Sequence, residues 1–164
     1  MTARRLSVVT SGGQTGVDRV ALERALEAGL EIGGWCPPGR VAEDGVVPHD
    51  LPLRETPRER SEKAPHIARS LRTEWNVRDA DGTLLLVPTG LDDPGCDWTR
   101  ECALLYGRPL LELDPREPGT GAATLRDWLD EHLIAVLNVA GPSLRTAPEN
   151  AGAASRLLAS ILGG

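Results

Sequence analysis

The chain has 164 residues and a formal net charge of −6, with a pI near 5.1. This length suits one domain, residues 1–164, and the acidic balance excludes an extended nucleic-acid surface, although a few backbone amides could still hold a small anion. Four Trp and one Tyr are too few aromatic residues to stack single-stranded nucleic acid in general, and no apolar run suits a signal peptide or a membrane span. We therefore expect a cytoplasmic protein without nucleic-acid or membrane partners.

The N-terminal segment predicts a strand, a glycine-rich loop and a helix. Residues 6–10, LSVVT, form a short β-type run. After the loop, apolar residues recur at helical spacing over residues 17–28. Thr15 and Asp18 have the spacing of a capping box at the helix start, and Gly29 is a natural stop after its last turn.

The next segment predicts two more strands, separated by a long loop and an interrupted helix. The second strand covers residues 32–35. Residues 36–56 are rich in Pro, Gly and charge and are too long for a plain connector, so we expect a functional or disordered loop. A helix spans residues 58–75 with an interruption at Pro65. Residues 83–87, TLLLV, have the uninterrupted apolar character of a buried parallel strand.

Helices and strands alternate over the rest of the chain: a helix at 98–106, a strand at 110–113, a helix at 122–132, a strand at 134–139 and a final helix at 151–162. This alternation predicts an α/β fold with an open, mainly parallel five-stranded sheet and helices on both faces. Ligands of such sheets bind outside the carboxyl ends of the strands. The loops with unusual chemistry at these ends are residues 11–16, 88–99 and 140–148. With the predicted strands in the order 2-1-3-4-5, the first two loops would flank the point where the strand order reverses.

The first of these loops, SGGQTG at residues 11–16, fits an anion site. It ends at a helix N-terminus, where free N–H groups and the helix dipole favour negative charge, and its glycines let the backbone approach a ligand closely. It lacks the Gly-Lys-Ser/Thr of a P-loop and the G-x-G-x-x-G of a dinucleotide fingerprint. The spacing favours phosphate binding, with a purely structural turn as the alternative.

Two charged stretches have simpler interpretations than a binding site. Residues 72–83 are typical of a solvated helix end followed by an Asp-Gly turn. Asp92, Asp93 and Asp97 could hold a hard cation beside a phosphate, but a solvated acidic loop explains them more simply.

The cysteines and histidines predict neither a metal site nor a nucleophile. Cys36, Cys96 and Cys102 lack C-x-x-C spacing, and we interpret them as reduced, buried, apolar residues. The three histidines are scattered without metal-ligand spacing.

Four blocks, read together, resemble the molybdenum cofactor carrier family: SGGQTGVDRVALERALEAG from Ser11, GGWCPPGRVAEDGVVP from Gly33, LRTEWNVRDADGTLLL from Leu71 and LNVAGPSLRTAP from Leu137. Their order and spacing extend the resemblance from about Val8 to the last helix. It implies a Rossmann-like fold, related to the cytokinin-activating phosphoribohydrolases and to DNA-processing nucleotide-binding domains. It also implies a homo-oligomer, dimer or tetramer, that binds molybdenum cofactor, a pterin with one terminal phosphate.

The resemblance, together with the loop chemistry, assigns ligand contacts to residues at the carboxyl edge of the sheet. Arg40, Arg78 and Arg145 would form charge-assisted bonds to oxyanions, and Asn76 and Asp79 would read the polar edge of a pterin or purine. The full expected set is Ser11, Gly12, Gly13, Gln14, Thr15, Gly16, Arg40, Asn76, Arg78, Asp79, Gly90, Thr99, Asn138, Gly141, Pro142 and Arg145.

Two departures from the family pattern are visible. Pro38 replaces a lysine that is common before Gly39. After the third strand, a longer acidic loop replaces the compact Gly-Gly-Thr turn of the family, so that Gly90 and Thr99 keep only part of that pattern.

The sequence supports three functions. The first is a carrier without catalytic residues, which holds a small phosphorylated ligand, molybdenum cofactor, and delivers it to apoproteins of molybdenum enzymes. The cofactor's own sulfurs would hold the metal, so no protein ligands are needed. The second is N-glycosidic cleavage of a nucleoside monophosphate, with Asp79, Asp81 or Glu101 as the required carboxylate. The third is a nucleotide sensor that binds without turnover.

Overall fold

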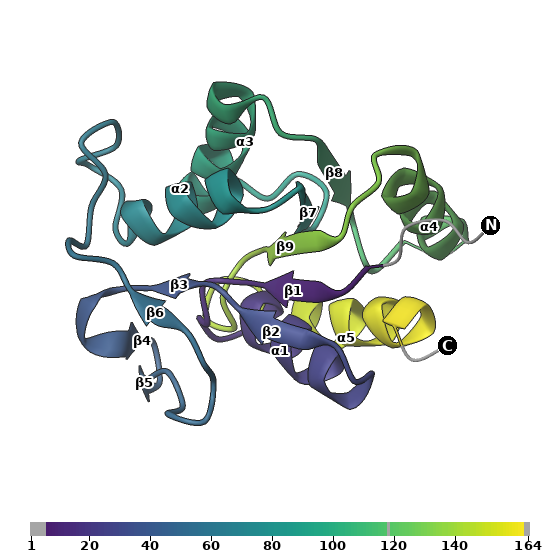
Figure 1. The fold of residues 1–164 in the computed structure, drawn as a ribbon, viewed down its shortest axis with the longest axis horizontal. Coiled ribbons are helices and arrows are strands. Elements are labelled where there is room, and N and C mark those ends of the chain that lie inside the picture. The colour runs from purple at the N-terminus through teal and green to yellow at the C-terminus, as the bar shows by residue number, and fades with distance from the viewer. Residues whose placement is uncertain (1–5, 118, 163–164) are drawn as a thin grey trace.

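A parallel sheet of five strands forms the centre of the computed structural model, which describes residues 6–117 and 119–162 (Figure 1). The strands are β1 (Val8–Thr10), β2 (Glu31–Gly33), β7 (Gly82–Leu86), β8 (Leu110–Leu113) and β9 (Val136–Ala140). Every neighbouring pair in this sheet is parallel. The predicted Rossmann-like α/β class is therefore confirmed.

The strand order is β2-β1-β9-β7-β8, so the last strand of the chain lies in the middle of the sheet. In terms of the five predicted strands the order is 2-1-5-3-4 rather than 2-1-3-4-5. Val9 is in register with Leu137, and Leu84 with Val139, and all four side chains are buried. Burial on both faces suits a central strand. The loop after β9 consequently lies between the loops that follow β1 and β7.

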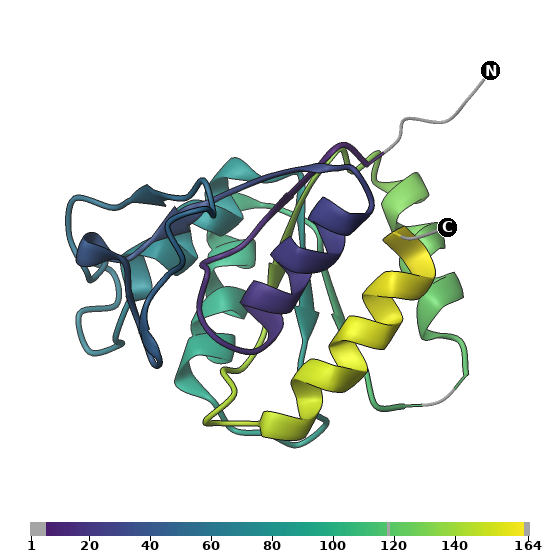
Figure 2. The ribbon, with the colours of Figure 1, turned by 90° about the horizontal axis from the view of Figure 1, so that it is seen from below.

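Helices cover both faces of the sheet, as predicted. They are α1 (Val17–Glu27), α2 (Ser70–Asp79), α3 (Pro94–Tyr106), α4 (Gly121–Glu131) and α5 (Pro148–Leu162). Helices α1 and α5 pack side by side on one face, with α4 against α5, while α2 and α3 pair on the other (Figures 1 and 2). Within the described residues, no helix is both long and apolar enough to cross a bilayer.

The main core lies between the sheet and the pair α1 and α5. Its buried members include Val9, Val17, Ala21, Leu84, Leu86, Leu137, Val139, Ala154 and Leu158. A smaller cluster, with Val77, Trp98 and Cys102, packs α2 against α3. All three cysteines are free and buried, which confirms their interpretation as small apolar residues.

Helix α1 begins where the sequence predicts, but not through the predicted capping box. Its N-cap is Gly16, and no side chain caps it. The Thr15 hydroxyl instead donates to the Glu43 carboxylate at 2.7 Å. The Asp18 carboxylate accepts a hydrogen bond from the Gln14 amide, which lies outside the helix. The capping box is therefore wrong, because Glu43 binds the Thr15 hydroxyl and the Gln14 amide binds the Asp18 carboxylate.

Residues 58–69 form turns instead of the predicted helix, and α2 begins only at Ser70. The backbone N–H of Ser61 donates to the Ser70 hydroxyl at 2.8 Å, and the Ser61 hydroxyl donates to Glu74. Pro65 cannot donate a helical hydrogen bond. Side-chain bonds to distant residues thus replace the helical ladder in this segment.

The long segment after β2 is ordered by small strands of its own. Strand β3 (Trp35–Cys36) pairs with β6 (Arg54–Glu55), and β4 (Val41–Ala42) pairs with β5 (Gly45–Val46). A short 3-10 turn, Pro38–Arg40, precedes β4. The buried side chains of this segment, which include Val47, Leu51 and Leu53, pack against Leu22 of α1.

The second predicted strand, residues 32–35, is split between two sheets. Strand β2 ends at Gly33, and Trp35 already belongs to β3. Gly34 between them has a φ of 127° and passes so close to the Ser11 carbonyl that no side chain fits. The chain therefore leaves the main sheet at Gly34.

Asp81, which lies between α2 and β7, binds the start of β9 at the amino edge of the sheet, away from the carboxyl ends. Its Oδ2 accepts hydrogen bonds from the backbone N–H groups of Ala135 and Val136 at 3.0 and 2.8 Å. Asp81→Ala leaves two amides without this acceptor, so we expect a loss of about 2 kcal/mol in the free energy of unfolding, measured by urea denaturation. The exposed Asp127→Ala is the control; equal stability of the two variants would contradict the assignment.

Candidate functional site

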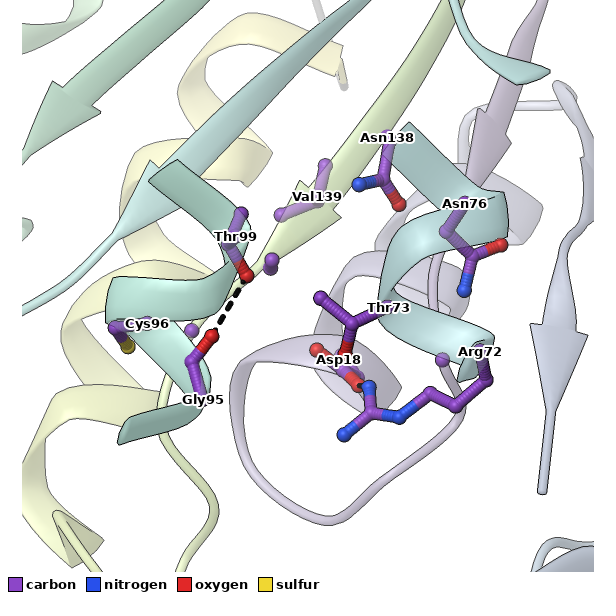
Figure 3. A pocket seen from close by; sticks show the side chains of 12 residues that line it. Asp18, Arg72, Thr73, Asn76, Gly95, Cys96, Thr99, Asn138 and Val139 are labelled. Atoms are coloured by element: carbon purple, nitrogen blue, oxygen red, sulfur yellow. Dashed lines mark hydrogen bonds and ion pairs between the residues drawn. The ribbon is translucent and has the colours of Figure 1, made fainter. Parts of the chain in front are cut away.

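A polar cavity opens at the carboxyl edge of the sheet, among the loop after β1, helix α2, the first turns of α3 and the end of β9 (Figure 3). Its enclosed volume is about 40 Å³, well below the range for small-molecule sites, so a larger ligand would extend into the open mouth. It is lined by Gly12, Asp18, Arg72, Thr73, Asn76, Gly95, Cys96, Thr99, Asn138, Val139, Ala140 and Gly141.

Five of the expected ligand contacts line this cavity: Gly12, Asn76, Thr99, Asn138 and Gly141. They come from the loop after β1, from α2, from the first turns of α3, and from the end of β9 with the loop that follows it. The fold therefore brings together segments separated by more than a hundred residues of sequence. The other expected contacts do not line the cavity, and most of them have other partners.

The glycine loop contributes only Gly12 to the cavity wall, because the rest of the loop binds to itself. The Gly13 amide donates to the Ser11 hydroxyl at 3.3 Å, and the Thr15 amide donates to Gln14 Oε1 at 3.4 Å. A Cβ on Gly16 would lie 2.6 Å from the Pro142 carbonyl, so the loops after β1 and β9 are in close contact there. These residues shape the loop and hold it against its neighbour.

Arg40 and Arg145 lie outside the cavity. The Arg40 guanidinium donates to the carbonyls of Val47, Pro48, Leu51 and Leu53 at 2.7 to 3.3 Å. It therefore holds the long segment after β2 in shape. Arg145 is exposed, and its backbone amide donates to Glu43 at 3.2 Å.

Arg78 and Asp79 form an exposed ion pair with an N–O distance of 2.7 Å. The Arg78 guanidinium also lies over the Trp75 ring, 4.6 Å from its centroid. The Trp35 indole N–H donates to Asp79 at 2.8 Å. Hydrogen bonding to Arg78 holds the pKa of Asp79 below its usual range. Gly90 borders a separate polar hollow at the ends of β7 and β8.

Asn76 reaches the cavity but has its amide engaged with the backbone. Its Oδ1 accepts from the Trp35 N–H at 2.8 Å, and its Nδ2 donates to the Trp35 carbonyl at 2.9 Å. The side chain thus pairs like a strand neighbour and fixes α2 against β3. Asn138, also buried, donates its amide to the Thr83 hydroxyl at 3.2 Å.

The charged residues of the cavity, Asp18 and Arg72, were not among the expected contacts. Arg72 Nη1 lies 3.1 Å from Asp18 Oδ2, and the two side chains are 17% and 3% exposed. Figure 3 shows Arg72 and Thr73 reaching from α2 toward Asp18, across from Gly95 and Thr99. Burial raises the pKa of Asp18, against the opposing effect of Arg72.

A signal for this side of the cavity is present in the sequence. Arg72, Thr73 and Asn76 are spaced so that they share one face of a helix. The guanidinium of Arg72 lies against Gly12, where any Cβ would overlap it. Nothing in the local sequence marks Asp18 as a cavity residue, because its spacing from Thr15 is that of a capping box.

The acidic loop before α3 caps that helix. The Asp93 carboxylate accepts from the Cys96 amide at 2.9 Å, and Asp97 pairs with Arg100 at 2.7 Å. An amide of the first turn is therefore already satisfied by the protein's own carboxylate, unlike in an open anion-binding helix terminus. Among the described residues, no group of three His, Cys, Asp or Glu side chains could hold a metal ion.

Glu43 links three loops beside the cavity: its own loop after β2, the loop after β1 and the loop after β9. Its carboxylate accepts from the hydroxyls of Thr15 and Ser143 at 2.7 and 2.6 Å, and its backbone amide donates to Gln14 Oε1 at 2.6 Å. Burial acts to raise the pKa of Glu43, but the hydrogen bonds from Ser143 and Thr15 outweigh it and lower the pKa below 4.5.

Glu43→Gln tests this tie through pH. A carboxyl with a lowered pKa in the folded protein stabilises it above its ordinary pKa of 4.5, and that contribution is lost as pH falls through the folded value. We expect the variant to lose about 1 kcal/mol at pH 7 and to show a shallower loss of stability below pH 4.5. Denaturant titrations at several pH values measure this. The exposed Glu62→Gln should behave like wild type, and identical acid profiles for both variants would refute the tie.

The composition of the cavity suits a polar ligand with an anionic group. Arg72 supplies a guanidinium, and Thr73, Thr99 and Asn138 supply neutral polar groups. Gly12, Gly95 and Gly141 also line the cavity, but Arg72 fills the space where a Gly12 side chain would lie, and Leu86 and Val17 fill that space at Gly141. Asp18 neutralises Arg72 in part and faces the same space.

The comparisons with known proteins identify the family of the chain. The chain matches the model of the circularly permutated YpsA SLOG family over residues 9–162. It is also similar to the crystal structure of a "Putative molybdenum carrier protein" from Syntrophus aciditrophicus SB, with 37% identity, a TM-score of 0.87 and 98% of each chain covered. No curated protein matches the chain. These matches confirm the resemblance carried by the four sequence blocks, and since the family model covers the chain from β1 to the end of α5, the chain belongs to the circularly permutated YpsA SLOG family.

Proposed function

We propose that the protein binds molybdenum cofactor at the cavity on the carboxyl edge of its sheet and carries it to apoproteins of molybdenum enzymes. The observation that carries this proposal is the cationic Arg72 side chain in a cavity otherwise lined by neutral polar groups, glycine backbone and one carboxylate. The "molybdenum carrier" name of the similar protein supports the choice of ligand. A cytoplasmic, homo-oligomeric protein would suit this function.

The residues present fit the phosphate and the heterocycle of such a ligand. A planar guanidinium such as that of Arg72 binds phosphate oxygens well. The hydroxyls of Thr73 and Thr99 and the amide of Asn138 suit the donors and acceptors of a pterin ring. The cofactor brings its metal on its own sulfurs. The enclosed volume of about 40 Å³ suits only a small anionic group, and the rest of such a ligand would lie in the open mouth.

Co-purification tests the proposal. Protein made in a host that synthesises the cofactor should carry molybdenum, measured by mass spectrometry, and should release a fluorescent pterin after oxidation. Protein from a host unable to make the cofactor is the matched control and should carry neither. If neither is found in the first preparation, and added cofactor decays as fast with the protein as without it, the carrier function is wrong.

Asp18 favours a second function, N-glycosidic cleavage of a nucleoside monophosphate. It is the one carboxylate that lines the cavity in the described chain, whereas Asp79, Asp81 and Glu101 do not line it. A carboxylate near a ribose could stabilise positive charge or activate water. Release of free base from nucleoside monophosphates, lost in Asp18→Asn, would establish this activity. Thermal stabilisation by nucleotides without turnover would indicate a nucleotide sensor instead.

A further inference from the structure

Two arginines of the described chain share an unusual backbone conformation, and only one of them has partners for its side chain. Arg40 and Arg69 both have a φ of 57°, in the left-handed region that costs energy for residues other than glycine. The guanidinium of Arg40 donates to four backbone carbonyls. These four hydrogen bonds compensate for the backbone strain at Arg40, whose role is structural.

Arg69 has no comparable compensation. Its Nε is buried and has no hydrogen-bond partner within the described residues. None of the ion pairs found in residues 6–117 and 119–162 includes it. Its side chain makes no hydrogen bond within the described residues, and its backbone amide donates to the Glu59 carboxylate at 3.2 Å. The fold alone gives no reason for a strained backbone that carries a partly buried cation without a partner.

The position of Arg69 supplies that explanation. It is the N-cap of α2, three residues before Arg72, so it lies next to the part of α2 that borders the cavity, although Arg69 itself is not among the lining residues. Arg72 repeats the same feature, because its Nε is also buried without a partner. Burial lowers the pKa of Arg69, and repulsion from Arg72 lowers it further, as expected for two neighbouring guanidiniums. Both nevertheless stay charged, as arginines do.

Two adjacent guanidiniums repel each other unless an anion lies between them. Asp18 pairs with Arg72 only, through a single N–O contact of 3.1 Å. Glu43, Glu59 and Asp18 attract the Arg69 charge from a distance, but none of them forms an ion pair with it within the described residues. A phosphate monoester, with a charge close to −2 at neutral pH and three acceptor oxygens, offers both the charge and the acceptors that these side chains lack.

We propose that Arg69 is a second anion-binding residue, which forms with Arg72 a two-arginine clamp for the dianionic terminal phosphate of the ligand. This rests on the proposed function, since it identifies the part of the ligand that the α2 face holds. The clamp makes the site selective for phosphate monoesters over the same heterocycle without phosphate. Arg69 is thereby the residue that distinguishes dianionic from neutral ligands.

Arg69→Gly is the sharpest test, because glycine accepts the left-handed conformation and removes the guanidinium. We expect its melting temperature to equal or exceed that of wild type, while the Kd for inorganic phosphate at pH 8, measured by calorimetry, rises at least tenfold. Arg69→Gln, which keeps the backbone demand and a polar side chain, should lose the same affinity. Arg58→Gln, at an exposed site, is the control and should bind as wild type does.

The outcomes separate this clamp from the carrier function. If Arg69→Gly binds phosphate as tightly as wild type while Arg72→Met does not, the Arg69 role is wrong and the carrier function stands. If wild type binds no phosphate but co-purifies with cofactor, the clamp is wrong and another part of the ligand is recognised. If wild type binds neither, both proposals fall. Equal retention of cofactor by wild type and Arg69→Gly would also overturn the clamp.

Discussion

Arg72→Met should abolish ligand retention and destabilise the protein at the same time. Removal of the guanidinium takes away a charge-assisted contact to the ligand's anion, so we expect bound molybdenum and pterin to fall at least tenfold. It also leaves Asp18, which is 3% exposed, as an uncompensated buried carboxylate. Breaking such a pair costs about 3 kcal/mol in the free energy of unfolding. The Arg58→Met variant, at an exposed position, should change neither quantity.

The pH dependence of this loss identifies its cause. Burial already raises the pKa of Asp18, and without the opposing charge of Arg72 it rises further. A carboxyl with a raised pKa in the folded protein contributes stability at low pH that is lost as pH rises through the folded pKa. The deficit of Arg72→Met against wild type should therefore be larger at pH 8 than at pH 5. Adding Asp18→Asn removes the buried charge and should recover most of the stability but not the ligand. A deficit independent of pH would contradict this account.

Gly141→Ala should distort the central loop of the site. A Cβ at this position would lie 2.5 Å from the Leu86 carbonyl and 2.6 Å from a methyl group of Val17. Neither neighbour is free to move, because Leu86 is in β7 and Val17 is buried at the start of α1. We expect a cost of about 3 kcal/mol in the free energy of unfolding, measured by urea denaturation, and reduced ligand retention.

Gly152→Ala is the matched control for this substitution. Gly152 lies inside α5, and the nearest atom to its Cβ would be Arg156 Nη1 at 3.6 Å, an ordinary contact. Alanine has the better helix propensity, so this variant should be about 0.5 to 1 kcal/mol more stable than wild type. A similar response of the two variants would mean that close packing at Gly141 is unimportant.

Local sequence signals predicted much of the fold, and non-local contacts explain the failures. The run at residues 83–87 is buried as strand β7, and the stop at Gly29 has the expected positive φ of 79°. Residues 58–69 have polar and charged residues compatible with a helix, yet Ser61 forms hydrogen bonds with Ser70 and Glu74 instead. The strand order could not be predicted from local sequence, because an apolar run such as that of β9 suits any position within a buried sheet.

The site was predictable as a location but not as a set of side chains. Parallel strands place the three loops at one edge whatever their order, and Gly12, Thr99 and Gly141 do line one cavity. Asp18 and Arg72 are 54 residues apart in the sequence, and they meet only because α2 lies beside the first turn of α1. Residue type alone also cannot show how a guanidinium is used, as the contrasting partners of Arg40 and Arg72 illustrate.

The central place of β9 has a consequence for how the chain acquires its structure during synthesis. Before residues 136–140 leave the ribosome, β1 with β2 and β7 with β8 can form only two separate parallel pairs, each with an open inner edge. Both edges pair with β9, so the sheet closes in one late event. This dependence on contacts far apart in sequence favours slow folding and exposes the nascent chain to aggregation. The cavity floor, which includes Asn138, Val139 and Ala140, comes into existence in that same event.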